Sequence, residues 1–193
     1  MKEVNPKGEI VWAWYAKDYF NRSPYKEMGS TDGGYSWLHV NAVSRLPNGN
    51  TLISARNFNF VIEVDAKGSV LRTIGEGVLD EQHDPEILPN GNLIATIHNS
   101  LPENRGKPQR AVEVNPDTGK IVWQFPIPGQ DNWPLRDANR LPNGNTLITG
   151  LNRIFEVTPP GGGGIVWQLT LKETVTHASG RGFYKAERID KQK

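Results

Sequence analysis

Short runs in which apolar and polar residues alternate follow one another along this chain, and the same turn joins several of them. The turn reads Leu-Pro-Asn-Gly-Asn and occurs three times, beginning at Leu46, Leu88 and Leu141. Each copy leads into a β-rich run, such as Thr-Leu-Ile-Ser at 51–54. Proline presets φ, and asparagine and glycine tolerate positive φ, so the phrase predicts a β-hairpin.

A second repeated phrase predicts two further strands in each unit. It begins with Glu-Val, passes through a turn and ends in an apolar run; its copies begin at Glu3, Glu63, Glu113 and Glu156. Each copy is typical of a strand, a turn and a strand. One repeat therefore holds four strands, the content of one propeller blade. The predicted fold class is all-β, a β-propeller of four-stranded antiparallel blades, with about four blades' worth of material.

The repeats also predict the domain organisation. Full blades are expected near 37–75, 81–126 and 134–170, within a single β-propeller domain over 1–193 that is truncated at its N-terminus. Residues 2–16 supply only the last two strands of a blade, and Gly182–Ile189 reads as one more strand. Alternatively, the opening and closing strands combine to seal a small ring. Two long loops, 17–36 and 99–110, are either functional or simple insertions.

Composition narrows the partners that we expect. The chain has 193 residues with 22 Lys and Arg against 21 Asp and Glu, which gives no electrostatic case for nucleic acid or a membrane surface. Without cysteine it has neither disulfides nor thiolate metal sites. The start of the sequence lacks a signal peptide, which predicts a cytoplasmic protein as written, or a periplasmic or extracellular one if the natural N-terminus is missing. A homo-oligomer could complete the propeller.

The three copies of the turn phrase differ at particular flanking positions. Five residues before each turn leucine the residues are Asn41, His83 and Arg136, and ten residues after it they are Arg56, His98 and Leu151. A four-residue loop would place these residues directly opposite one another in pairs: Asn41 and Arg56, His83 and His98, Arg136 and Leu151. A G1 bulge would shift this register by one residue.

The first strand of a propeller blade lines the central axis, so these positions should converge at one mouth of the channel. His39 lies two residues before Asn41 and should share its face, whereas Asp84 and Asp137 should point to the other face. The predicted site therefore consists of His39, Asn41, Arg56, His83, His98 and Arg136. Polar residues at a wet channel mouth could equally have no function. His177 is expected in a surface loop. Trp14, Trp37 and Trp133 are expected to pack, or else to stack on an aryl group.

Imidazole, guanidinium and amide groups together suit an anion with several oxygens. Arginine beside histidine makes a poor divalent-metal site, so neither a metal nor another cofactor is expected. No serine occupies an equivalent position, which argues against a Ser-His-Asp arrangement. The two nearby cations, Arg56 and Arg136, should lower the pKa of a histidine at this site and favour its neutral form. A neutral imidazole can act as a covalent nucleophile.

Three segments carry a family resemblance: 37–43, 52–57 and 82–92. They resemble the bacterial and archaeal arylsulfotransferases that use aryl sulfates, and not the nucleotide PAPS, as donors. The specific motifs cover roughly 37–100, and the rest matches mainly the blade pattern. The resemblance implies a six-bladed β-propeller that transfers a sulfuryl group from an aryl sulfate to a phenol by a ping-pong mechanism through a sulfohistidine.

By the same resemblance, His83 is the nucleophile, His39 and Asn41 bind the sulfuryl oxygens, and Arg56 neutralises their charge. His39 is also a candidate to protonate the leaving oxygen, and His98 and Arg136 are assigned to substrate binding. The family's additional histidine in an earlier blade has no counterpart in this sequence. The alternative function is a non-catalytic propeller that binds an anionic ligand or a protein partner at the channel mouth.

Overall fold

The structure is a computed structural model that describes residues 1–21, 37–128, 134–159, 161–162, 164–172 and 182–189. Its regular structure is almost entirely β. The strands are β1 (Lys2–Val4), β2 (Ile10–Ala13), β3 (Val40–Arg45), β4 (Thr51–Ala55), β5 (Phe60–Val64), β6 (Val70–Ile74), β7 (His83–Ile87), β8 (Leu93–Ile97), β9 (Arg110–Val114), β10 (Ile121–Pro126), β11 (Leu135–Arg140), β12 (Thr146–Gly150), β13 (Arg153–Val157) and β14 (Ile165–Thr170). Short 3-10 helices occur at η1 (Ala16–Asp18), η4 (Arg56–Phe58) and η5 (Pro102–Asn104).

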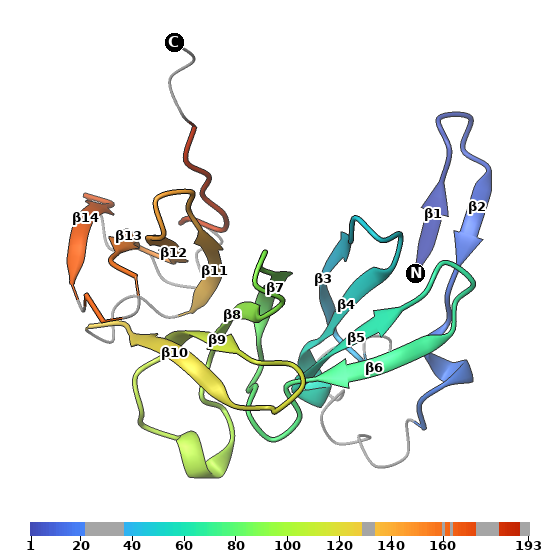
Figure 1. Ribbon diagram of the computed structural model, residues 1–193, viewed down its shortest axis with the longest axis horizontal. Helices are drawn as coiled ribbons and strands as arrows, with labels where there is room; N and C mark the ends of the chain where they lie inside the picture. The colour runs from blue at the N-terminus through green and yellow to red at the C-terminus, as the bar shows by residue number, and fades with distance from the viewer. Residues whose placement is uncertain (22–36, 129–133, 160, 163, 173–181, 190–193) are drawn as a thin grey trace.

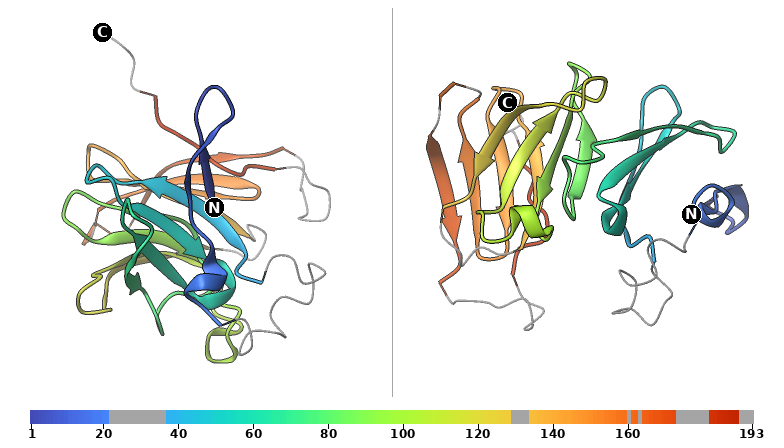
Figure 2. Two further views of the ribbon diagram at one scale, coloured as in Figure 1. Left: turned by 90° about the vertical axis from the view of Figure 1, so that its right-hand side faces the viewer. Right: turned by 90° about the horizontal axis from the view of Figure 1, so that it is seen from below.

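The strands form three four-stranded antiparallel sheets, β3 to β6, β7 to β10 and β11 to β14, and a two-stranded sheet of β1 and β2. Within each sheet the strands follow chain order, as in a propeller blade. The sheets stand side by side in chain order (Figures 1 and 2). The first strands β3, β7 and β11 are successive neighbours across the sheets. The predicted all-β, blade-like fold class is therefore confirmed.

Each repeated turn is a β-turn followed by a bulge. In the first copy the Gly49 amide donates to the Leu46 carbonyl (2.9 Å) and the Leu46 amide donates to the Asn50 carbonyl (2.8 Å), with Gly49 at φ 86°. The first strand pair beyond the turn is Arg45 with Thr51. The register expected for a four-residue loop is thus wrong by one residue, the shift that a G1 bulge produces.

A second irregularity lies near the opposite end of each first strand. The register shifts between Val40 and Ala42, between His83 and Glu86, and between Leu135 and Asp137. As a result Val40 pairs with Ala55, His83 with Thr96, and Leu135 with Gly150. The three predicted cross-strand pairs are therefore wrong, because two bulges per hairpin displace them.

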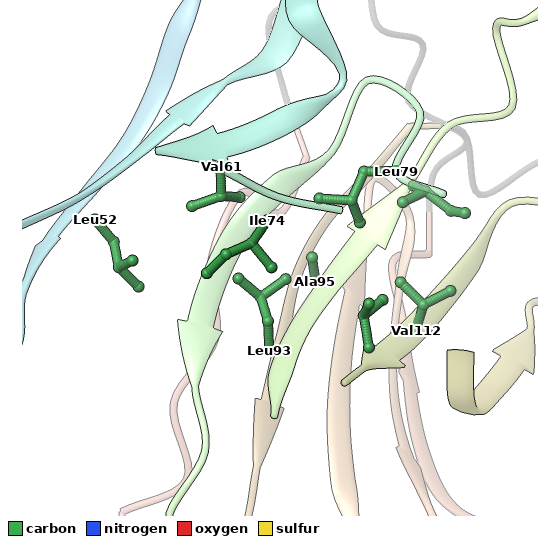
Figure 3. Close-up of a cluster of buried hydrophobic side chains, with 9 residues drawn as sticks. Leu52, Val61, Ile74, Leu79, Leu93, Ala95 and Val112 are labelled. Carbon is green, nitrogen blue, oxygen red and sulfur yellow. The ribbon is translucent and has the colours of Figure 1, made fainter. Parts of the chain in front are cut away.

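The hydrophobic core lies between the sheets. Leu52 and Leu93 belong to one buried cluster between the β3–β6 and β7–β10 sheets, shown in Figure 3. Their neighbours Ile53 and Ile94 point to the opposite faces of the same strands and belong to separate clusters. The two-residue period of a β-strand thus lets the middle strands β4 and β8 each pack on both faces.

The turn end of every full blade is held by the same polar contacts. Each turn asparagine donates to a buried glutamate of the third strand at 2.7 Å, in the pairs Asn50–Glu63, Asn92–Glu113 and Asn145–Glu156. An arginine completes each set: Arg72, Arg140 and Arg188. These contacts explain in physical terms why Asn and Glu recur at these positions.

The closing segment departs from the prediction. Residues 182–189 form no strand, so the predicted strand at Gly182–Ile189 is wrong. The segment is instead held against β11 by side chains: Asn139 Nδ2 donates to the Ala186 carbonyl (3.2 Å), and the Ala186 amide donates to Asp137 Oδ2 (3.5 Å).

The loop 99–110 is built on a buried carboxylate. Asp80 is fully buried and accepts hydrogen bonds from Ser100, Leu101 and Asn104. The loop is therefore an ordered part of the second blade. Of the loop 17–36 only residues 17–21 are described, and Trp133 and His177 lie outside the described residues.

Two of the tryptophans pack in the interior. Trp14 is 2% exposed and stacks on Tyr19, and Trp37 packs on Phe58. Packing, the first of their two predicted roles, accounts for both.

Candidate functional site

His83 begins β7 and is 4% exposed. Its Nδ1 lies 3.1 Å from the Glu81 carbonyl oxygen, and its Nε2 lies 3.2 Å from Nη1 of Arg136. A carbonyl oxygen only accepts and a guanidinium only donates. Nδ1 therefore carries the proton, and Nε2 presents its lone pair to Arg136.

His98 follows the end of β8, and its ring stacks on that of His83 with the centroids 4.3 Å apart. Its Nε2 lies 2.6 Å from the Leu135 carbonyl oxygen and therefore donates to it. Its Nδ1 faces Oε2 of Glu81 at 3.8 Å. The two imidazoles meet although they are not directly opposed in the sheet, because His98 lies beyond the ladder.

The surroundings keep both histidines neutral. Burial, followed by His98 and with smaller contributions from Arg136 and Arg56, lowers the pKa of His83 to about 2 against the opposing effect of the Glu81 carbonyl. Burial also lowers the pKa of His98 to about 4, with Arg56 and Arg136 adding to it against the Leu135 carbonyl. At pH 7 both rings are therefore uncharged, the form in which an imidazole is a nucleophile.

A pocket opens beside His83. It is lined by Asn41, His83, Asp84, Arg136, Tyr184 and Lys185. The bulges in β3 and β11 place Asn41 and Arg136 there, since each is the residue left out of the strand pairing. Asn41 also donates to the Gln82 carbonyl at 2.8 Å, which ties the first blade to the residue preceding His83.

The remaining predicted residues, Arg56 and His39, lie next to this group. Arg56 Nη2 is 2.5 Å from Glu81 Oε2, the carboxylate that also faces His98. The His39 carbonyl accepts the Arg56 amide at 3.3 Å, and His39 has φ 46°. The bulge at Asn41 interrupts the alternation that predicted a shared face for His39 and Asn41.

The structure adds residues that the sequence reasoning missed or misplaced: Glu81, Asp84, Tyr184 and Lys185. Asp84 was expected on the other face of its strand, but it lines the pocket because β7 is bulged there and its φ is 44°. The sequence held a signal for this, since proline at position 85 cannot donate to the ladder and is typical of a bulge. Nothing local in the sequence marks Tyr184 and Lys185.

Backbone strain collects at the site. His39, Glu81 and Asp84 are non-glycine residues with φ between 44° and 49°. Such conformations cost on the order of 1–3 kcal/mol each and cluster at functional sites. Asn59 supports the Glu81 conformation by accepting its amide at 2.8 Å, and the buried Gln82 side chain donates to the Phe60 carbonyl at 2.8 Å.

The pocket thus sets guanidinium, ammonium and amide donors beside a neutral imidazole. Arginine, lysine and asparagine are suited to sulfate-like groups. Within the described ranges, no three His, Asp or Glu side chains approach one another closely enough to hold a metal ion. In the same part of the chain, no helix has the length and apolar character needed to cross a membrane.

Residues 1–77 match the model of the arylsulfotransferase (ASST) family, which confirms the resemblance predicted from the sequence. The matched region contains His39, Asn41 and Arg56 and ends before His83, His98 and Arg136. No curated protein matches the chain.

Two similar solved structures bear on the fold. A protein of unknown function from Bacteroides caccae is 18% identical with a TM-score of 0.58, covering 89% of this chain and 59% of its own. The selenomethionine-substituted virginiamycin B lyase from Staphylococcus aureus is 16% identical with a TM-score of 0.53, covering 88% of this chain and 47% of its own. This chain thus spans less than two thirds of either structure, and the likeness is one of fold.

Proposed function

We propose that this chain carries the sulfuryl-transfer site of an arylsulfotransferase. In the proposed reaction a sulfuryl group passes from an aryl sulfate to His83 and then to a phenol. The observation that carries the proposal is the state of His83: its Nδ1 proton is fixed by the Glu81 carbonyl, and its Nε2 lone pair faces Arg136. The family match over residues 1–77 supports the same reaction class.

In the first step the Nε2 lone pair of His83 attacks sulfur, a new N–S bond forms, and the S–O bond to the aryl oxygen breaks. The bonding electrons leave with the phenolate. The ring becomes an N-sulfuryl imidazolium that keeps its proton on Nδ1, and the Glu81 carbonyl stabilises that proton. A fixed dipole of this kind costs no reorganisation during the reaction.

Arg136 is placed to hold the sulfuryl oxygens. Its guanidinium contacts Nε2 of His83. When the sulfur of an aryl sulfate approaches this nitrogen, the guanidinium exchanges its contact with the lone pair for hydrogen bonds to the sulfuryl oxygens. Asn41 lines the same pocket. The assignment of His39 to sulfuryl binding rests on the family resemblance alone. The Arg56 ion pair with Glu81 positions the backbone that orients His83.

In the second step an acceptor phenol attacks sulfur and the N–S bond breaks, which returns the lone pair to Nε2. Over the whole cycle the proton that the acceptor loses is the proton that the released phenolate gains. The cycle needs no metal, nucleotide or redox partner. Its two half-reactions predict ping-pong kinetics and a burst of the first phenol.

The test is the intact mass of the chain after incubation with 4-nitrophenyl sulfate and no acceptor. We expect one added sulfuryl group that maps to His83 and is lost when a phenol is added. His83→Asn keeps a donor for the Glu81 carbonyl but has no nucleophilic nitrogen, and should take up no label. His177→Asn, at a position that the sequence assigns to a surface loop, is the control and should label normally.

The second candidate is a non-catalytic propeller that binds an anionic ligand at this pocket. The contact between Nε2 and Arg136 favours it, because the lone pair is engaged without a substrate. In that case the unsubstituted chain and His83→Asn would bind 4-nitrophenyl sulfate with similar affinity, and neither would be labelled. This result, or a label on another residue, would overturn the first proposal.

A further inference from the structure

The closing segment reaches the pocket from far along the chain and is fixed on both sides of its pocket residues. Before them, the Phe183 amide donates to the Leu151 carbonyl at 2.9 Å. After them, Ala186 is held by Asn139 and Asp137, and Arg188 lies 3.1 Å from Glu156. Tyr184 and Lys185 are therefore a fixed part of the pocket wall.

Tyr184 presents a flat aromatic surface at the pocket. The Arg136 guanidinium lies 5.2 Å from its ring centroid, while the residue remains 60% exposed. One contact thus orients the ring by a cation–π interaction, and most of its surface stays available. An exposed aromatic ring beside an oxyanion site is suited to stack on an aryl group.

Lys185 brings a second cation to the same pocket. Its Nζ lies 2.8 Å from Oδ2 of Asp84, which follows the His83 nucleophile directly. Asp84 also neighbours the buried carboxyl of Asp137, and burial together with Asp84 raises the pKa of Asp137 to about 8. The ion pair with Asp84 therefore positions the Lys185 ammonium in the pocket.

We propose that Tyr184 and Lys185 form the aryl subsite: the Tyr184 ring stacks on the ring of the aryl sulfate, and the Lys185 ammonium hydrogen-bonds the phenolic oxygen that leaves. This inference rests on the proposed function and adds the recognition of the leaving group. When the S–O bond breaks, negative charge develops on that oxygen, and a positioned cation stabilises it.

The test for Tyr184 is equilibrium binding, which does not depend on turnover. Calorimetry with the His83→Asn chain should show that Tyr184→Ala weakens binding of 4-nitrophenyl sulfate roughly threefold to tenfold, with the affinity for inorganic sulfate unchanged. The matched control is Tyr15→Ala, because Tyr15 is also exposed and also carries a cation, Lys17, over its ring. Unchanged binding, or an equal loss for sulfate, would overturn the assignment of Tyr184.

The test for Lys185 is the rate of His83 labelling with two donors of different leaving ability. Lys185→Met should slow labelling by phenyl sulfate about 10²- to 10³-fold and labelling by 4-nitrophenyl sulfate much less, because nitrophenolate needs less stabilisation. A purely structural role would slow both donors equally, and that outcome would overturn the assignment. Lys17→Met is the control for the loss of a lysine.

These readouts separate the two proposals. If the chain takes up no sulfuryl group at all, the proposed transfer reaction fails, while the calorimetric comparison of aryl sulfate with sulfate still decides whether Tyr184 binds the ring. For Lys185 in that case, Lys185→Met should weaken binding of 4-nitrophenolate and leave that of sulfate unchanged. Equal binding of 4-nitrophenolate with and without the lysine would then count against the subsite.

Discussion

The two ends of the blades differ in how far the three blades resemble one another. At the turn end the three full blades are nearly identical: each turn asparagine donates to its glutamate at 2.7 Å, and each turn glycine has φ between 83° and 86°. The opposite end of the blades holds the pocket and is called the mouth end. Its equivalent positions are Asn41, His83 and Arg136, and no two are alike. The turn end therefore repeats one set of stabilising hydrogen bonds in every blade, whereas the mouth end brings together an amide, an imidazole and a guanidinium.

The energetic character of the two ends also differs. The turn end satisfies its buried glutamates with amide and guanidinium donors in favourable backbone conformations. The mouth end contains features that lower stability: non-glycine residues in left-handed conformations, two buried neutral histidines and two nearby arginines. Sites that depart from local rules in this way are typical of function. The comparison predicts that substitutions at the turn end affect stability, while substitutions at the mouth end affect chemistry.

The largest effect should follow removal of a turn-end glutamate. Glu113 is 5% exposed and accepts from Asn90, Asn92 and Arg140. Glu113→Ala leaves the Arg140 cation without its partner, which costs about 3–5 kcal/mol for a buried pair. Urea unfolding should show this loss, and the rate of His83 labelling in the folded chain should not change.

The matched control is Glu103→Ala, because Glu103 is exposed in the 99–110 loop. Its free energy of unfolding should stay within about 0.5 kcal/mol of the parent value. Glu156→Ala should be milder than Glu113→Ala, because its partner Arg188 is 46% exposed and Arg140 only 15%. If Glu113→Ala abolished labelling without loss of stability, the division between the two ends would be wrong.

The next effect belongs to the mouth end. Arg136→Gln removes the cation that contacts Nε2 of His83, and labelling should slow by about 10²- to 10³-fold, the usual cost of one oxyanion donor. Stability should be retained, because burial and the nearby Arg56 both disfavour the Arg136 charge, as its lowered pKa shows. Unfolding by urea and labelling by intact mass, measured on one preparation, check both parts. A large loss of stability with normal labelling would contradict the prediction.

The repeated patterns predicted the turn end well. Proline, asparagine and glycine at fixed positions specify a turn locally, and alternating apolar residues specify which face is buried, so strands and blade content followed from the sequence. The same local information predicted that variable residues gather at the opposite end. His83, Arg136 and Asn41 do line one pocket, and His98 contacts His83.

The wrong predictions concern features that depend mostly on contacts between distant residues, and among them only the bulge at Asp84 had a local signal, Pro85. The exact cross-strand pairs depend on bulges at Asn41, Asp84 and Arg136, each of which shifts the register. Lys185 reaches Asp84 across 101 residues of sequence. The closing segment matched a strand in composition, but in the fold side chains of β11 hold it, so strand propensity alone gave the wrong element.

Acid unfolding should separate the two ends by pH. The folded pKa of His83 is about 2 and that of His98 about 4, both below the ordinary value of 6.5. As pH falls below 6.5, these rings become protonated in the unfolded chain but stay neutral in the folded chain. Each ring therefore lowers the free energy of unfolding by about 1.4 kcal/mol per pH unit. The pKa of Glu63 and Glu156 is lowered from 4.5, so the turn end loses its contribution only at lower pH.

The measurement is the free energy of unfolding at several pH values between 6.5 and 5, above the range in which the turn-end glutamates titrate. Asp137, whose folded pKa is raised to about 8, adds a slope of opposite sign that the parent and the variants share. His98→Gln keeps a donor for the Leu135 carbonyl and removes one titrating ring, although Asp80, Glu81, Arg56 and Arg136 remain around it. Its slope against pH should be shallower than that of the parent by about 1.4 kcal/mol per pH unit, whereas Glu156→Ala should keep the parent slope. Parallel slopes for the parent and His98→Gln would mean that His98 is protonated in the folded chain, and the neutral histidine pair would lose its basis.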